Sequence, residues 1–276
     1  MRAILPLLSL ALALAACGST SGAGAPDGVA ADSTAADTAA ADTDAAAIGC
    51  GEPERAVTFT TSDGVRLAAD WRPAAAPGAP AVVLLHMVPP ANDRANYPAA
   101  FRELLAAKGL AVLNVDRRGA GDSEGSATAA YTGPDGKRDV EAAVAFLAAS
   151  GCPTDAARTG LVGASNGSTS VLDYTVAAAA GAVTGPVPAA IVFLTGGSYT
   201  ENQNAVADHR AVLDAIPIRF VFSTAERAWS AAFAANAPAA WVFDEYDPGD
   251  HGTRMFAARP EAMTAVADFL AATLAP

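Results

Sequence analysis

A serine stands between two glycines in residues 163–167, Gly-Ala-Ser-Asn-Gly, which is the spacing of a nucleophile held on a sharp turn. A short apolar run, 161–162, precedes the first glycine, and a stretch compatible with a helix follows from Ser168 to Ala180. Small residues two positions before and after Ser165 leave room for the neighbouring strand and helix, so that its hydroxyl stands exposed above a sheet. We therefore expect a nucleophile here. The alternative is a glycine-rich turn that only packs a helix onto a sheet.

Length and composition limit the class of protein. The 276 residues suffice for one large α/β domain or two small ones, and 52% of them are hydrophobic against 17% charged, which is a globular profile. The net charge is −12 and no basic stripe is present, which argues against nucleic acid as a partner. The three histidines have no partners at metal-ligand spacing, and no G-x-x-x-x-G-K-[ST] phosphate loop occurs. We expect neither a metal nor a cofactor.

Residues 1–17 have the pattern of a lipoprotein signal peptide. Arg2 gives a positive start, the apolar core 4–14 is too short to span a bilayer, and Ala-Ala-Cys ends the segment at Cys17. This ending resembles the bacterial lipobox, which implies cleavage before Cys17 and acyl chains that anchor it to a membrane. Gly18, where an inner-membrane retention signal resembles Asp, favours the outer membrane of the cell envelope. The alternative is an ordinary secretory signal with a chance cysteine.

Residues 18–50 are a low-complexity linker of Ala, Asp, Thr, Gly and Ser. No large apolar side chain recurs there at helical or strand spacing, so the segment cannot bury enough surface to offset its ordering entropy. We expect a disordered tether that holds the domain 51–276 about 30 Å from the membrane.

Two cysteines remain if Cys17 is lipidated. Cys50 precedes the first expected strand, and Cys152 lies in the loop before the strand that leads to the serine. Beyond the inner membrane two such thiols are expected to pair, and neither has a nearby histidine that would indicate a thiol nucleophile.

Strands alternate with helices through the domain 51–276. Two extended runs, 56–61 and 65–71, flank the turn dipeptide Asp63-Gly64 and predict a β-hairpin. Further strands are expected at 81–85, 110–115, 161–162, 189–194, 218–222 and 240–243, and helices at 98–108, 135–149, 168–180 and from Pro260 onward. This order predicts an α/β fold with a doubly wound, mostly parallel sheet and no second domain.

Three motifs resemble the α/β-hydrolase fold family, in its dienelactone-hydrolase-like and serine-aminopeptidase-like branches. They are the turn 163–167, the strand end 84–88, Leu-Leu-His-Met-Val, where the family often has His-Gly, and the stretch 114–125, which is similar to the family's D-x-R-G-x-G-x-S loop. The resemblance covers about residues 55–274. It implies a sheet of about eight strands with helices on both faces and a short lid between residues 197 and 217.

The resemblance also implies a catalytic triad in the order serine, acid, histidine. His251 follows the last expected strand, where the family places its base, and would accept the Ser165 proton during attack. His86 matches the family's structural histidine beside the oxyanion loop, and His209 is interpreted as a solvated surface residue.

The acid of the triad is expected after the strand 218–222. Glu226 fits by position, although Ser223 and Glu226 replace both ends of the family's G-x-x-D pattern. A longer carboxylate can still accept a hydrogen bond from the second N–H of the imidazole. Glu201 is the alternative acid. The later carboxylates are interpreted as a solvated acidic loop, with calcium binding as the alternative: Asp244, Glu245, Asp247 and Asp250.

Backbone amides are expected to form the oxyanion hole. The Asn166 amide lies at the positive end of the helix after the nucleophile. The resemblance implies that the second amide is that of Met87, with Val88 as the alternative, and the Met87 side chain narrows the site without removing the donor. Tyr199 and Trp229 are candidates for the wall of a substrate pocket, and the alternative is that they are ordinary core aromatics.

The leading interpretation is a lipid-anchored serine hydrolase that cleaves carboxylic esters of small molecules through an acyl-enzyme. A serine peptidase of the same fold is the alternative within the enzymes. A non-catalytic envelope lipoprotein that retains the fold is the alternative outside them. The altered acid motif favours that alternative, and the presence of both Ser165 and His251 argues against it.

Overall fold

The computed structural model describes residues 48–133, 135–197, 199 and 203–275. The expected signal segment with Cys17, nearly all of the linker 18–50 and the alternative acid Glu201 lie outside these residues. No helix among the described residues is long and apolar enough to cross a membrane.

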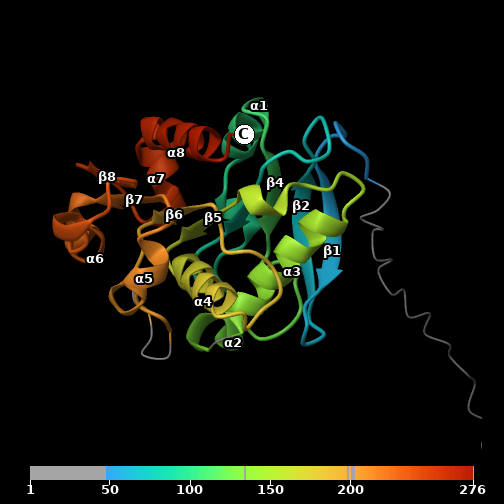
Figure 1. Cartoon of the computed structure of the whole chain (residues 1–276), viewed down its shortest axis with the longest axis horizontal. Coiled ribbons are helices and arrows are strands. Elements are labelled where there is room, and N and C mark those ends of the chain that lie inside the picture. The colour runs from blue at the N-terminus through green and yellow to red at the C-terminus, as the bar shows by residue number, and fades with distance from the viewer. Residues whose placement is uncertain (1–47, 134, 198, 200–202, 276) are drawn as a thin grey trace, which may run out of the picture. The chain divides into compact units, whose positions relative to one another are not determined.

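In the described part of the chain, eight strands form one mostly parallel sheet (Figure 1). The order across it is β1-β2-β4-β3-β5-β6-β7-β8, in which β2 pairs antiparallel with both β1 and β4. The strands are β1 (Arg55–Thr60), β2 (Arg66–Arg72), β3 (Ala81–Leu85), β4 (Ala111–Val115), β5 (Thr159–Ala164), β6 (Ala190–Leu194), β7 (Ile218–Ser223) and β8 (Trp241–Tyr246). The sheet predicted from the alternation of strands and helices is confirmed.

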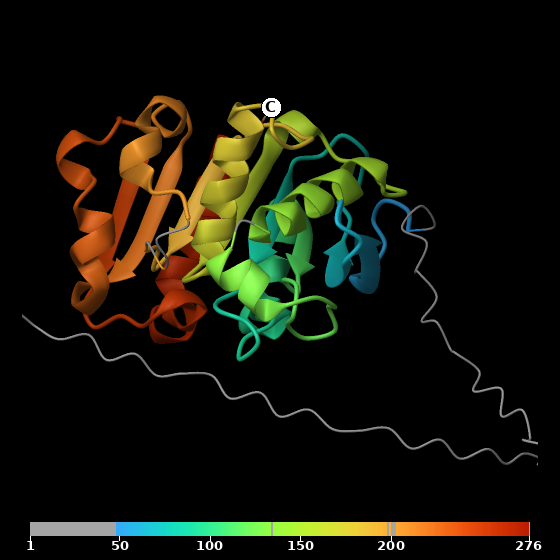
Figure 2. The same cartoon turned by 90° about the horizontal axis from the view of Figure 1, so that it is seen from below.

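Helices cover both faces of the sheet. Figure 1 shows α1 and α8 on one side and α3 and α4 on the other, and Figure 2 shows α3 and α4 in front of the strands. The α-helices of the described residues are α1 (Ala99–Ala107), α2 (Ala127–Thr132), α3 (Gly136–Ala149), α4 (Gly167–Ala179), α5 (Arg210–Leu213), α6 (Arg227–Ala231), α7 (Met255–Ala258) and α8 (Pro260–Thr273). Because helices shield both faces, every residue of β3, β4, β5 and β6 is buried, as the apolar runs predict.

The edge strand β8 corrects one sequence-based interpretation. It runs to Tyr246, so Asp244 and Glu245 belong to the strand and not to a solvated loop. Asp244 pairs with Arg219 of the neighbouring β7, and Glu245 pairs with Arg227. These charge pairs let an acidic sequence continue a strand that hydrophobicity alone would end near residue 243.

A disulfide joins Cys50 to Cys152 across 102 positions of the chain. It ties the start of the described domain to the loop before β5, the strand that leads to Ser165. A crosslink over so long a loop restricts the unfolded chain, an effect that typically stabilises a domain by about 2–4 kcal/mol.

Candidate active site

Ser165 occupies a strained turn between β5 and α4. Its φ of 50° lies in the left-handed region, which non-glycine residues seldom adopt. The flanking glycines are required by space, because a Cβ on Gly163 would lie 2.6 Å from the Ser168 Cα and one on Gly167 would lie 2.3 Å from the Leu85 carbonyl oxygen. The turn therefore has the geometry that the Gly-x-Ser-x-Gly spacing predicts. Contrary to the expected exposure, Ser165 is only 4% exposed.

A chain of hydrogen bonds leads away from the serine hydroxyl. The Ser165 Oγ lies 2.6 Å from His251 Nε2, and His251 Nδ1 lies 2.7 Å from Glu226 Oε1. Since a carboxylate only accepts, Nδ1 carries the proton, and Nε2 is left free to accept from the serine hydroxyl. The Ser223 hydroxyl donates to the other Glu226 oxygen at 3.4 Å. The two residues that depart from the family's acid motif thus contact each other.

The loop that carries His251 is fixed from several sides. The Gly252 N–H donates to the Thr195 Oγ1 at 2.9 Å, and the His251 N–H donates to the Asp250 carboxylate. Thr195 itself has a φ of 52°, which is a costly conformation for a β-branched residue. Its N–H donates to the Val221 carbonyl. The strained Thr195, just after β6, therefore links the loop that carries His251 to β7, the strand before Glu226.

Two loops bring backbone amides to the serine. The end of β3 lies directly against the turn, since a Cβ on Gly167 would also lie 2.6 Å from the His86 carbonyl oxygen. Within the described residues, the N–H groups of Met87, Val88 and Asn166 donate no hydrogen bond to the protein. These are the amides that were expected to supply an oxyanion hole, and all three are free to donate.

The side chain of His86 is neutral and holds the backbone at Met87, just after β3, in place. Burial, and secondarily the charge of Arg117, lowers the pKa of His86 to about 3. Its Nε2 accepts from the Arg117 backbone N–H at 2.9 Å, and its Nδ1–H donates to the Met87 carbonyl at 2.8 Å. This is the structural role that the family resemblance implies for this histidine.

The two candidate pocket aromatics lie in different surroundings. The Tyr199 hydroxyl donates to the Thr195 carbonyl at 2.8 Å and contacts Ser165, so this ring lies at the nucleophile. The Trp229 ring packs edge-on against Phe193 and belongs to an aromatic cluster with Phe220 and Phe233. Trp229 therefore fits the interpretation as a core aromatic.

Neither the remaining histidine nor a metal site contributes to this geometry. His209 is half-buried, with Nε2 2.8 Å from the Asn204 side-chain oxygen, and is not the freely solvated residue that was expected. Among the described residues, no group of three or more His, Cys, Asp or Glu side chains is arranged to hold a metal ion.

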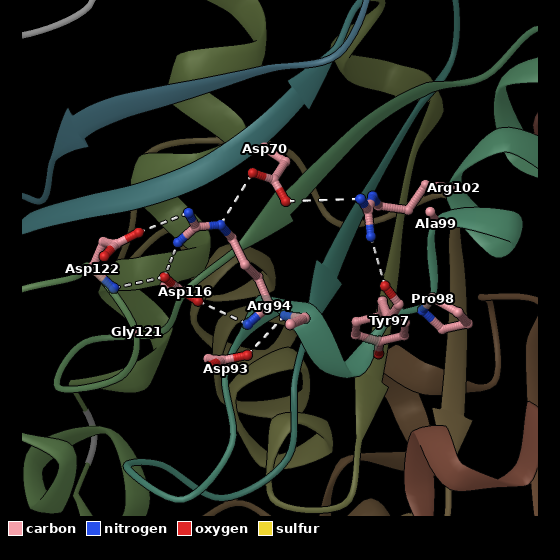
Figure 3. A pocket seen from close by; sticks show the side chains of 11 residues that line it. Asp70, Asp93, Arg94, Tyr97, Pro98, Ala99, Arg102, Asp116, Gly121 and Asp122 are labelled. Atoms are coloured by element: carbon pink, nitrogen blue, oxygen red, sulfur yellow. Dashed lines mark hydrogen bonds and ion pairs between the residues drawn. The ribbon is translucent and has the colours of Figure 1, made fainter.

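A second polar feature lies between β2, β4 and the segment before α1 (Figure 3). It is a hollow of about 440 Å³, here called the Arg94 hollow, and its lining includes Asp70, Asp93, Arg94, Arg102, Asp116 and Asp122. The Arg94 guanidinium bonds to the carboxylates of Asp70, Asp116 and Asp122. No local sequence pattern predicts this cluster, because its members lie far apart in the chain.

Comparisons with known proteins agree with this architecture. No curated protein matches the chain. An esterase of Pyrococcus furiosus superposes with a TM-score of 0.62 at 16% identity, over 80% of this chain and 93% of that one. A predicted CIB-like hydrolase of Thermoplasma acidophilum gives 0.58 at 16% identity, over 80% and 100%. A dienelactone hydrolase of Anabaena variabilis gives 0.52 at 16% identity, over 80% and 96%.

One family covers most of the sheet and both loops that meet at Ser165. Residues 63–218 match the family described as X-Pro dipeptidyl-peptidase (S15 family). Because these residues make up more than half of the chain, the protein belongs to this family and is a hydrolase with the α/β-hydrolase fold.

Proposed function

We propose that the protein is a serine hydrolase in which Ser165 is the nucleophile, His251 the general base and Glu226 the acid that orients it. The observation that carries this proposal is the continuous pair of contacts, 2.7 Å from Glu226 to His251 and 2.6 Å from His251 to Ser165. Distances in this range allow direct proton transfer between serine and imidazole.

The reaction follows from this arrangement. The Ser165 Oγ bonds to the substrate carbonyl carbon while its proton passes to His251 Nε2, and the carbonyl oxygen takes the negative charge. The Asn166 and Met87 amides donate to that oxygen. When the carbonyl forms again, the alcohol leaves with the proton from His251. Water then loses a proton to His251 and attacks the acyl-enzyme, and the carboxylic acid departs as Ser165 regains its proton.

Carboxylic esters are the proposed substrates. Between β6 and β7 the described residues contain only short helical turns, including α5, so the described part of this segment forms no bulky cap over Ser165. A covering segment with so little described structure suits short or exposed acyl groups. The similar structures with names that state an activity include an esterase and a dienelactone hydrolase, which supports the same class.

Peptide hydrolysis is the second candidate, and the family match over residues 63–218 favours it. The chemistry at Ser165 would be the same, with an amine in place of the alcohol as the leaving group. Nitrophenyl butyrate and an X-Pro nitroanilide separate the two candidates, because the preferred substrate has the larger kcat/KM.

A fluorophosphonate probe tests the proposal directly. We expect the full-length protein to be labelled and Ser165→Ala to lose labelling and at least about 10³-fold of esterase activity. His251→Ala should lose most of both. A folded wild-type protein that is not labelled and cleaves neither substrate would contradict the proposal and favour a binding role in the envelope.

A lipid anchor on Cys17 is also part of the proposal. The lipobox-like ending of residues 1–17 and the tether-like composition of residues 18–50 support it, and Gly18 favours the outer membrane. In a bacterial host, wild-type protein should incorporate labelled palmitate and sediment with outer membranes. Cys17→Ser should do neither.

A further inference from the structure

Two neighbouring arginines are buried in contrasting ways. Arg117 is 0% exposed and Arg118 is 2% exposed. The Arg118 guanidinium is neutralised by the carboxylates of Asp139 and Asp63. Among the described residues no carboxylate contacts Arg117, and its buried Nε has no hydrogen-bond partner. Burial lowers the pKa of Arg117 to about 10, which still leaves it charged at neutral pH. The carboxylates of Asp139 and Asp173 act on this charge only from beyond contact distance, and a buried cation without a directly bonded counter-ion is costly.

The Arg117 guanidinium reaches the two loops of the candidate oxyanion hole. Its Nη1 donates to the Asn166 side-chain oxygen at 2.9 Å, and it lies 3.4 Å from the carbonyl oxygens of His86 and Met87. Its backbone N–H bonds to His86, the ring that holds the Met87 carbonyl. One residue therefore contacts both segments whose free amides flank Ser165.

The contact to His86 has an electronic consequence. The His86 carbonyl and the Met87 N–H belong to one peptide unit. A cation at the oxygen end of a peptide increases its dipole, so the N–H at the other end becomes a stronger donor. Such a charge, already in place before the reaction, stabilises an oxyanion without reorganising during the step.

We propose that Arg117 is the positioning residue of the oxyanion hole: its guanidinium holds the Asn166 side chain and the His86–Met87 peptide in place, and its buried charge polarises that peptide toward an oxyanion on the Ser165 adduct. This inference rests on the proposed function. The buried charge would stabilise the oxyanion of the transition state, which a residue with a purely structural role would not do.

The test compares Arg117→Met and Arg117→Lys with wild-type protein in the full-length chain. With nitrophenyl butyrate, we expect Arg117→Met to lower kcat about 10- to 100-fold, since displacing one oxyanion donor costs about 10²–10³-fold, while KM stays within about threefold. Affinity for an alkylboronic acid, which forms an anionic adduct with a serine nucleophile, should fall by the same factor as kcat/KM. Arg117→Lys retains the charge and should recover part of both losses.

The matched control is Arg118→Lys, one residue away and equally buried. It disturbs the pairs with Asp139 and Asp63, so it should lower the unfolding temperature while kcat stays within about twofold. If Arg117→Met does not fold, Asn166→Ala cuts the 2.9 Å contact and leaves the backbone amide in place. We expect it to lower kcat about tenfold.

The results distinguish a failure of the proposed function from a failure of the role proposed for Arg117. A wild-type protein that neither reacts with fluorophosphonate nor cleaves either substrate contradicts the proposed function. An active wild type with a folded Arg117→Met of unchanged kcat and boronate affinity overturns the role of Arg117 alone. So does a loss in Arg117→Met that Arg118→Lys reproduces in kcat, because a general loss of stability would then explain both.

Discussion

The Arg94 hollow and the Ser165 site both lie where loops leave the carboxyl ends of parallel strands, yet they are built on opposite principles. In the hollow, the Arg94 guanidinium bonds to three carboxylates, and Arg102 bonds to Glu54. Around Ser165, the backbone N–H groups of Met87, Val88 and Asn166 are free, no carboxylate of the described residues contacts Arg117, and two residues have left-handed backbone. Charges that are paired with one another stabilise a fold, whereas free backbone donors beside a strained turn are available for chemistry.

The two regions are nevertheless connected. The Asp116 carboxylate in the hollow accepts from the Arg94 backbone N–H, and Arg117 follows it directly in the chain. The hollow thus fixes the loops on which the Ser165 site is built. If this division is correct, mutations in the site should change activity more than stability, and mutations in the hollow should do the reverse.

The largest expected effect is on activity, in Glu226→Gln. Glutamine keeps the size of the side chain but removes the charge that holds the His251 Nδ1–H and stabilises the imidazolium, so we expect kcat to fall about 10³–10⁴-fold. The unfolding free energy should change by less than about 1 kcal/mol, since the pair with His251 is partly exposed. Esterase kinetics and urea unfolding measure both. Glu226→Asp retains the charge and should lose less. Activity near wild type in Glu226→Gln would mean that another group orients the imidazole.

Arg94→Met should lower the stability of the protein and leave its activity nearly unchanged. It leaves the fully buried Asp116 carboxylate without its guanidinium partner, and breaking such a pair costs about 3 kcal/mol or more. We expect urea unfolding to show this loss while kcat/KM of the folded protein stays within about threefold. Asp122→Asn is the matched control, because the Asp122 side chain is mostly exposed and its pair should contribute at most about 1 kcal/mol. A loss of kcat beyond tenfold in Arg94→Met would show that the hollow does not act through stability alone.

The sequence predicted those parts of the fold and site that local patterns determine. All of the expected strands are present because apolar runs of strand length in an alternating α/β chain have one favourable arrangement, a sheet covered on both faces. The turn at Ser165 was predictable because only small residues fit at 163 and 167. The short helices α2 and α6 were not, since five or six residues carry little periodicity.

Contacts between segments far apart in the chain could not be predicted from these local patterns. Arg117 stood within the motif that indicated the fold, but its bond to Asn166 joins residues 49 positions apart. The strained Thr195 carries no signal, since threonine is an ordinary residue at a strand end. Ser223 was interpreted as a departure from a motif, whereas it contacts Glu226. The missed residues share one property: their role depends on what the fold places beside them.

The smallest expected effect concerns acid pH and His86. Burial lowers the pKa of His86 to about 3 in the folded protein, whereas in the unfolded chain it returns to about 6.5. Between these values the unfolded chain binds one more proton, so the free energy of unfolding decreases as pH falls below about 6.5. At pH 5 the loss from this residue amounts to about 2 kcal/mol, at 1.36 kcal/mol per pH unit.

Urea unfolding at pH 7.5 and pH 5, in wild type and in His86→Gln, isolates this contribution because the other titrating groups are common to both proteins. Wild type should lose about 2 kcal/mol more than the variant between the two pH values. Equal losses would mean that His86 is protonated in the folded protein near pH 5. Its Nε2 could then not accept from the Arg117 N–H, and the backbone at Met87 would be held by contacts other than those of a neutral His86.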